Sequence, residues 1–175
     1  MENILKTKLE IYSNLQTKIT CPIGIVGSTS LFLQGFCQFV EPNRDLDLVL
    51  INPTEKDIEL IANLAVLSPN KRLKDLQEQY GVGTIRNPYF LNLNGIDVDI
   101  FSISYEIKDK DGKENFEEEA EFITILKYNK KILVSTFVRA ILLRKKYNRP
   151  KDWVFLLKVS DWVREGFKLE NIFNH

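Results

Sequence analysis

The stretch that decides the fold is Asp45-Leu46-Asp47-Leu48-Val49-Leu50-Ile51, in which acidic residues and leucines alternate before the run becomes wholly apolar. Alternation with a period of two predicts a β-strand, and the apolar end predicts that this strand is central and buried. Asp45 and Asp47 then leave the same face, about 6.6 Å apart at their Cα atoms. Two carboxylates this close repel each other unless a cation joins them. A solvated strand edge is the alternative explanation.

A short strand and a glycine turn precede this stretch. Residues 23–26 are apolar, Gly27 and Ser28 follow, and the next apolar residues predict a helix that stops at Gly35. Ser28 to Ser30 supply candidate N-caps for that helix. Glycine lets a phosphate approach the backbone, and helix-start N–H groups with the hydroxyls of Ser28 and Ser30 favour an anion. A purely structural turn is the alternative.

A β-hairpin further along the chain supplies more carboxylates. Residues 86–93 and 96–104 have strand patterns, and the Asn94-Gly95 pair between them is typical of a type I′ turn. Asp97 and Asp99 share one face of the second strand. On geometry either could be the third carboxylate, and Asp99 is favoured because Asp97 adjoins the flexible turn.

If the strand of Asp99 neighbours the strand of Asp45 and Asp47, three carboxylates converge. Their repulsion raises at least one pKa unless cations occupy the site. Oxygen ligands without His or Cys suit Mg²⁺, which keeps several waters and takes further ligands from substrate phosphates. The residues therefore predict phosphoryl or nucleotidyl transfer.

The remaining patterns complete an α+β fold. Further helices are expected at residues 4–15, 53–67 with Thr54 as N-cap, 71–80, 132–147 and 151–164, and a second hairpin from Asp111-Gly112 to a strand at 122–126. We expect a mixed β-sheet core flanked by helices over residues 1–130. A C-terminal helical pair, residues 131–175, packs on that core in what is overall a single domain.

Composition excludes several classes of chemistry. The chain of 175 residues has one histidine, His175 at the end, which argues against catalytic triads and His-ligated zinc or iron. Cys21 and Cys37 lack CxxC spacing and are read as buried thiols of a reducing compartment. No signal peptide or long apolar run is present, so we expect a soluble, cytoplasmic protein without membrane association.

The charges balance, with 24 basic and 24 acidic residues, but they are unevenly placed. Residues 139–151 hold six basic side chains and no acid, while residues 114–121 hold five glutamates and no base. A solvated helix face is the ordinary explanation of such a basic run. No basic stripe interleaved with aromatic residues marks a nucleic-acid track, so a nucleic-acid partner is not indicated.

Together the motifs resemble the nucleotidyltransferase family built on a DNA polymerase β-like palm core. The resemblance rests on Val26-Gly27-Ser28, Asp45-Leu46-Asp47-Leu48 and Val98-Asp99-Ile100, and covers roughly residues 20 to 104. Sixteen residues separate Ser28 from Asp45, more than is usual in the family, so the connecting loop is expected to be extended. The resemblance implies that Asp45, Asp47 and Asp99 are catalytic and hold the metal, with two Mg²⁺ ions expected.

The C-terminal part is similar to abortive-infection AbiEii-like and related bacterial nucleotidyltransferases, through Arg149-Pro150-Lys151-Asp152 after a basic helix. That likeness implies that Arg139 and Lys151 face the triphosphate, and helix-surface charge is the alternative. Arg44 either contacts a substrate phosphate or neutralises its acidic neighbours. The family often has a further acid soon after Lys-Asp, where this chain has Phe155-Leu156.

The sequence thus predicts a Mg²⁺-dependent, NTP-using nucleotidyltransferase that binds ATP or another NTP and moves a nucleoside monophosphate to an acceptor hydroxyl. The acceptor and base preference stay open, with a small molecule or protein favoured over a polynucleotide. A non-catalytic nucleotide- or partner-binding relative is the alternative, and one half of a toxin-antitoxin pair is a third interpretation. Because a chain of this size forms a shallow cleft, a second copy or a partner protein could complete it.

Overall fold

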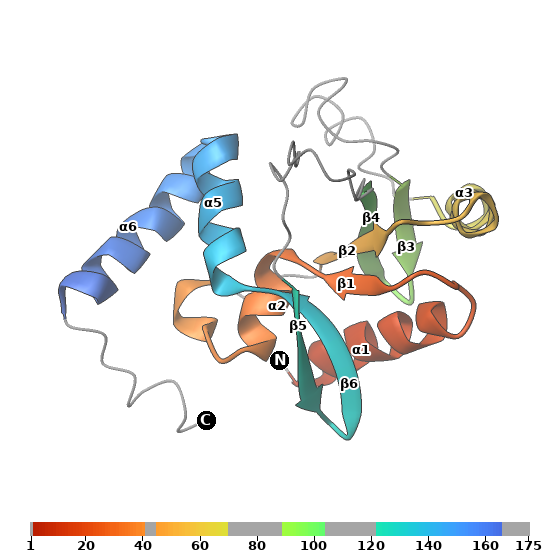
Figure 1. The fold of residues 1–175 in the computed structure, drawn as a ribbon, viewed down its shortest axis with the longest axis horizontal. Helices are drawn as coiled ribbons and strands as arrows, with labels where there is room; N and C mark the ends of the chain where they lie inside the picture. Colours follow the sequence, from red (N-terminus) through yellow and green to blue (C-terminus); the bar gives the residue numbers. More distant parts are fainter. Residues whose placement is uncertain (1, 41–44, 70–88, 104–121, 166–175) are drawn as a thin grey trace, which may run out of the picture. The chain divides into compact units, whose positions relative to one another are not determined.

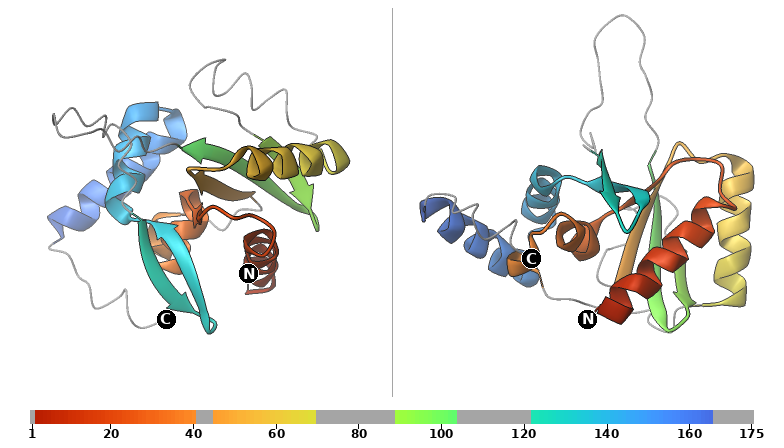
Figure 2. Two further views of the ribbon diagram at one scale, coloured as in Figure 1. Left: turned by 45° about the vertical axis from the view of Figure 1, so that its right-hand side comes forward. Right: turned by 90° about the horizontal axis from the view of Figure 1, so that it is seen from below.

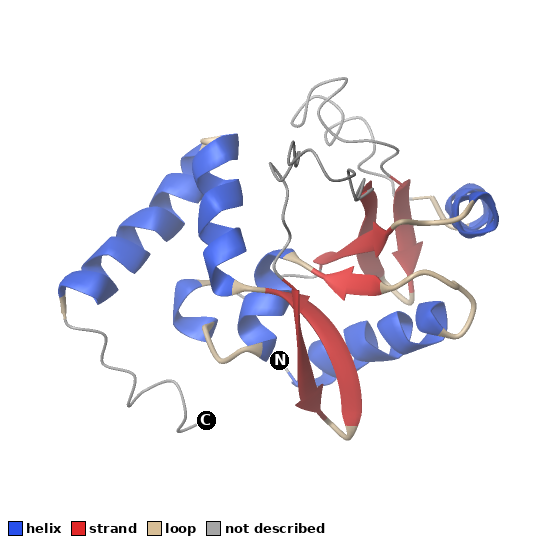
Figure 3. Ribbon diagram, viewed as in Figure 1, coloured by secondary structure: helices blue, strands red, loops and turns tan. Residues whose placement is uncertain are grey.

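The computed structural model describes residues 2–40, 45–69, 89–103 and 122–165. The chain divides into two compact units, residues 1–25 with 44–119, and residues 26–43 with 120–175. Helices and strands occur in both units, which confirms the α+β class (Figures 1 and 3). The second unit also takes in residues 26–43 and 120–130, which the sequence analysis assigned to the core.

The first unit is built on four strands in the order β3-β4-β2-β1. They are β1 (Ile23–Ile25), β2 (Asp45–Ile51), β3 (Tyr89–Leu93) and β4 (Ile96–Ile103). Strands β2 and β4 are parallel, whereas β1 with β2 and β3 with β4 are antiparallel, so the sheet is mixed. Asn94 and Gly95 have φ of 53° and 77°, which confirms the predicted type I′ turn of the β3–β4 hairpin.

Helices α1 (Glu2–Gln16) and α3 (Glu55–Leu67) lie on the same side of strands β2 to β4 (Figure 2). The Tyr12 hydroxyl of α1 donates a hydrogen bond of 3.0 Å to the Ile23 carbonyl of β1. Thr54 caps α3 as predicted, and it forms a capping box with Asp57. Asp57 also accepts a hydrogen bond of 2.7 Å from the Thr20 backbone N–H, so it joins α3 to the segment after α1.

Burial opposes ionisation of Asp57, which is 2% exposed, yet the hydrogen bonds from Thr20 and Thr54 lower its carboxyl pKa to about 2. The charged form of Asp57 is therefore part of the folded structure near neutral pH. The carboxylate satisfies backbone donors of two segments far apart in the chain.

In the described part of the second unit, two helical segments precede a pair of strands and two helices follow it. Its elements are α2 (Gly27–Leu33), the 3₁₀ helix η1 (Cys37–Phe39), β5 (Phe122–Lys127), β6 (Lys130–Ser135), α5 (Phe137–Tyr147) and α6 (Pro150–Arg164). α2 confirms the helix predicted after Gly27, which ends before Gly35, and η1 lies in the long connection from α2 to β2. Pro150 occupies the first turn of α6, as predicted.

A helix was expected to begin at Ile132, but residues 130–135 form strand β6, which pairs with β5 in antiparallel orientation. That expectation was wrong. Tyr128 and Asn129 adopt positive φ of 52° and 56° at the turn between the two strands. Ile132 and Val134 are both fully buried, in the alternation of a strand. The helix starts only at α5, where the Thr136 hydroxyl accepts a hydrogen bond from the Arg139 backbone N–H.

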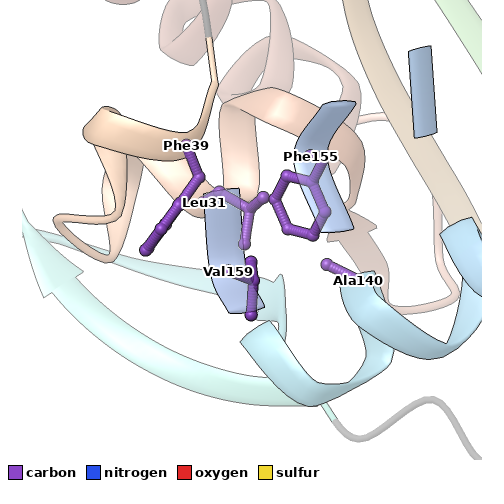
Figure 4. Close-up of a cluster of buried hydrophobic side chains, with 5 residues drawn as sticks. All are labelled: Leu31, Phe39, Ala140, Phe155 and Val159. Atoms are coloured by element: carbon purple, nitrogen blue, oxygen red, sulfur yellow. The ribbon is translucent and has the colours of Figure 1, made fainter. Parts of the chain in front are cut away.

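An aromatic-rich cluster forms the core of the second unit (Figure 4). Its buried members are Leu31, Phe39, Ala140, Phe155 and Val159, which come from α2, η1, α5 and α6. Half-buried aromatic side chains extend the cluster, and the rings of Phe36 and Phe137 stack with centroids 4.2 Å apart. This packing ties the C-terminal helices to α2, the helix that starts at Gly27.

The expected helix at 71–80 and the Asp111-Gly112 hairpin lie outside the described residues. Within the described ranges, none of the helices has the length and apolar character needed to cross a bilayer.

Candidate functional site

The candidate site is a row of aspartates on two neighbouring parallel strands of the first unit. In the β2–β4 register Asp47 is opposite Asp99, and Asp45 is opposite Asp97. Paired residues of neighbouring strands point to the same face of a sheet, and the strands are about 4.8 Å apart. The four carboxylates therefore start from one face of the first unit, two on each strand.

The carboxylates differ in exposure and in their neighbours across the sheet. Asp99 is 4% exposed, whereas Asp45, Asp47 and Asp97 are half-buried. The side-chain amide of Asn92 on β3 donates a hydrogen bond of 2.8 Å to Asp97. Asp97 thus has a neutral partner at the hairpin end of the row, while Asp99 lies deeper.

Alternation along β2 separates these acids from the apolar face. Leu46, Leu48 and Leu50 are all fully buried, and Val98 and Ile100 on β4 are equally so. A shift of the β2–β4 register by one residue would place aspartates beside leucines, which the buried apolar face opposes. The hydrophobic effect on one face therefore determines the carboxylate row on the other.

Lys8 on α1 is a charged neighbour of this row that the sequence analysis did not single out. Lys8 is only 4% exposed. Burial lowers the pKa of the Lys8 ammonium group below its ordinary value, and the charges of Asp47 and then Asp45 oppose that shift. Lys8 lies among the buried positions Leu5, Leu9 and Tyr12 of α1, a placement that could have marked it as unusual for a lysine.

The donor types fit magnesium, since the row offers carboxylate oxygens. Within the described part of the chain, however, no set of three or more His, Cys, Asp or Glu side chains is arranged to hold a metal ion. The backbone register brings the strands of Asp45, Asp47 and Asp99 together.

The Gly27 turn belongs to the second unit. Gly27 has φ of 65°, a conformation that glycine adopts without strain, and it is the first residue of α2. Val26 is the N-cap of α2 and no side chain caps the helix, so the expected capping by residues 28–30 was wrong. α2 has only seven residues, and Ser28, its second, is half-buried.

Ser30 is fully buried within the second unit. Its hydroxyl donates a hydrogen bond of 2.8 Å to the Gly27 carbonyl and lies 3.1 Å from the Ser135 hydroxyl of β6. These contacts stabilise the turn and join α2 to β6. In this conformation the Ser30 hydroxyl supports the turn from inside rather than presenting itself to a ligand.

The predicted cationic residues have different environments. Arg139 is 7% exposed, and its guanidinium group lies over the Phe122 ring, 5.2 Å from the ring centroid. Lys151 is exposed on the first turn of α6. Arg44 lies outside the described residues.

The Arg-x-Lys-Asp motif has a structural task at the start of α6. Asp152 is 2% exposed, and its Oδ2 atom accepts a 2.7 Å hydrogen bond from the Arg149 side chain and a 3.0 Å bond from the Arg149 backbone N–H. Burial opposes ionisation of Asp152, but these bonds and the Arg149 charge lower its carboxyl pKa. The pair caps α6, and Lys151 beside it is exposed.

Cys21 is not an activated nucleophile. Cys21 and Cys37 are both free, and Cys21 is buried as predicted while Cys37 is half-buried. Burial, together with the charge of Asp57, raises the pKa of the Cys21 thiol to about 11.

Comparison of the chain with protein-family models, with curated proteins and with solved structures gave no match. The residues and geometry of this chain are therefore the basis of the functional proposal.

Proposed function

We propose that the chain is a Mg²⁺-dependent nucleotidyltransferase, which transfers a nucleoside monophosphate from an NTP to an acceptor hydroxyl and releases pyrophosphate. The observation that carries the proposal is the parallel, in-register pairing of Asp47 with Asp99. It brings acids 52 positions apart in the sequence onto adjacent strands and the same sheet face. That juxtaposition is what a carboxylate-held divalent metal site needs.

The proposed roles follow from position. Asp45 and Asp47 would hold both metal ions, and Asp99 would complete the second metal site and favour loss of the acceptor hydroxyl proton. When bound, Mg²⁺ would supply charge neutralisation at the phosphates and polarise the reacting oxygens. The chain needs no histidine for this chemistry, because positioning and electrostatic stabilisation provide most of the catalysis in phosphoryl transfer.

Phosphate binding is proposed for residues of the second unit. Gly27 supplies a backbone conformation open to close approach, and the half-buried Ser28 supplies a hydroxyl beside it. Exposed Lys151 and the guanidinium of Arg139 are the candidate cationic contacts. Ser30 is assigned to support of the turn instead, because its hydroxyl is bonded to Gly27.

The test is nucleotide binding and turnover by the full chain, with a matched pair of variants from the same sheet face. We expect Asp47→Asn to weaken calorimetric binding of Mg²⁺ with a non-hydrolysable NTP at least tenfold. Asp97→Asn is the control, since Asp97 bonds to Asn92 and is not a proposed ligand. Unchanged affinity in Asp47→Asn would contradict the assignment.

Turnover is measured with labelled NTPs and candidate acceptors, including the protein itself and tRNA. Labelled acceptor that disappears in Asp99→Asn supports transfer. Binding of Mg²⁺ and NTP without any labelled product would favour the alternative, a nucleotide-binding relative that lacks catalysis.

A further inference from the structure

Lys8 is a buried charged residue of the first unit that the proposed chemistry does not use. It is 4% exposed, although lysine is almost never fully buried unless it is paired. A buried ammonium group is stable only when nearby negative charge compensates for its lost hydration.

The Tyr12 hydrogen bond fixes the level of α1 along β2. The Tyr12 hydroxyl bonds to the Ile23 carbonyl, and Ile23 pairs with Leu50 near the end of β2. Lys8 is one helical turn before Tyr12, about 6 Å along the axis. Asp47 and Asp45 are the charges that act on the Lys8 ammonium group, in that order. α1 therefore runs along β2 in the same direction, with Lys8 at the aspartate end.

We propose that Lys8 is a built-in counter-ion of the carboxylate row, which offsets the charge of Asp47 and Asp45 when no divalent cation is bound. Four aspartates start from one face of β2 and β4, so the row carries more negative charge than two neighbouring strands tolerate at low cost. Lys8 lowers this repulsion from within the protein. It is a positioning residue that acts through the aspartates. The metal part of this inference rests on the proposed function.

A divalent cation at the same carboxylates would take over the neutralisation. The Lys8 charge and the cation then oppose each other, and linkage makes this opposition reciprocal. Removing the Lys8 charge should destabilise the metal-free protein most, and should tighten the binding of Mg²⁺ by about fivefold or more. If Lys8 only fills space with its aliphatic stem, Lys8→Met should change neither the dependence of stability on Mg²⁺ nor the affinity for Mg²⁺.

Lys8→Met tests the charge, because methionine keeps most of the length of the stem. In EDTA we expect Lys8→Met to lower Tm by about 5 °C or more, and in saturating Mg²⁺ the gap from the wild type should shrink by at least half. Lys8→Arg retains the charge and should keep the metal response of the wild type. Lys6→Met on the exposed side of α1 is the control and should change neither value. A gap of the same size in EDTA and in Mg²⁺ would overturn the proposal.

A double-mutant cycle in EDTA separates this inference from the proposed function. If Lys8 pairs with the row, Lys8→Met should lower Tm less in the Asp47→Asn background than in the wild type. Additive Tm changes would overturn the counter-ion role whether or not the protein binds metal. Coupling in the cycle, together with a wild-type Tm that Mg²⁺ leaves unchanged, would support the counter-ion and count against the metal site. If Lys8→Met does not fold, Lys8→Gln, which also removes the charge, and its cycle with Asp47→Asn supply the same comparison.

Discussion

Asp99→Asn should change the stability of the protein in opposite directions with and without Mg²⁺. Asp99 is 4% exposed and paired across the sheet with Asp47, so the two carboxylates start about 4.8 Å apart. At 5 Å, two unit charges repel by about 3 kcal/mol for an effective dielectric of 20 and about 1 kcal/mol for that of water. Asparagine keeps the shape of the side chain and removes the charge. In EDTA the free energy of unfolding should therefore rise by about 1 to 3 kcal/mol.

With Mg²⁺ the order should reverse. A cation at one hundred times its dissociation constant stabilises the wild type by about 2.7 kcal/mol, and a variant that no longer binds it gains nothing. Urea unfolding at pH 8, where an ordinary carboxyl is ionised, measures both conditions. Asp161→Asn, on the exposed side of α6, is the control and should behave alike in EDTA and Mg²⁺. An Asp99→Asn variant less stable than the wild type in both conditions, by the same amount, would refute the reasoning.

Three further predictions follow from the described contacts. Asp57→Ala should lower the free energy of unfolding by about 2 kcal/mol near pH 7. Because the pKa of the Asp57 carboxyl is lowered to about 2 in the folded state, this contribution is present above pH 4 and is lost as the pH falls toward 2. Urea unfolding of the variant and the wild type across that pH range measures the loss. Asp152→Asn should break the pair with Arg149 and lower the free energy of unfolding by about 2 kcal/mol or more. Hydrogen exchange should locate the loss of protection at the start of α6, and protection there equal to that of the wild type would contradict this account. Gly27→Ala and Gly95→Ala should each lower the free energy of unfolding by about 1 kcal/mol, because both glycines have positive φ. Only Gly27→Ala should weaken the binding of Mg²⁺ with NTP in calorimetry. If the two variants bind with equal affinity, Gly27 is not part of the proposed site.

Local patterns predicted the elements whose cause is local. β2 begins and ends where the alternation of Asp45 to Ile51 does, and the hairpin turn falls on Asn94-Gly95. Thr54 caps α3 because its side chain reaches an N–H three residues away. These features depend on residues within a few positions of one another, so a sequence contains their whole explanation.

The errors occurred where a short apolar run admits two structures. Ile132 and Val134 were assigned to the start of a helix, but they alternate in β6 and are paired with β5. Periodicity cannot separate a strand of six residues from a helical turn, and partner strands then decide. Lys8 was not singled out from the sequence, because its neighbours in the chain give no indication of the aspartate charges that act on it.

The order of residues is enough to predict that acids alternate with leucines on one strand, and that a second strand carries two more acids after a tight turn. That the two strands are parallel neighbours, with Asp47 opposite Asp99, and that Lys8 is buried, emerged from the fold. The reason is physical. Pairing between distant strands is selected by burial of the shared leucine and isoleucine face, and the positions of the charges on the other face follow from that choice.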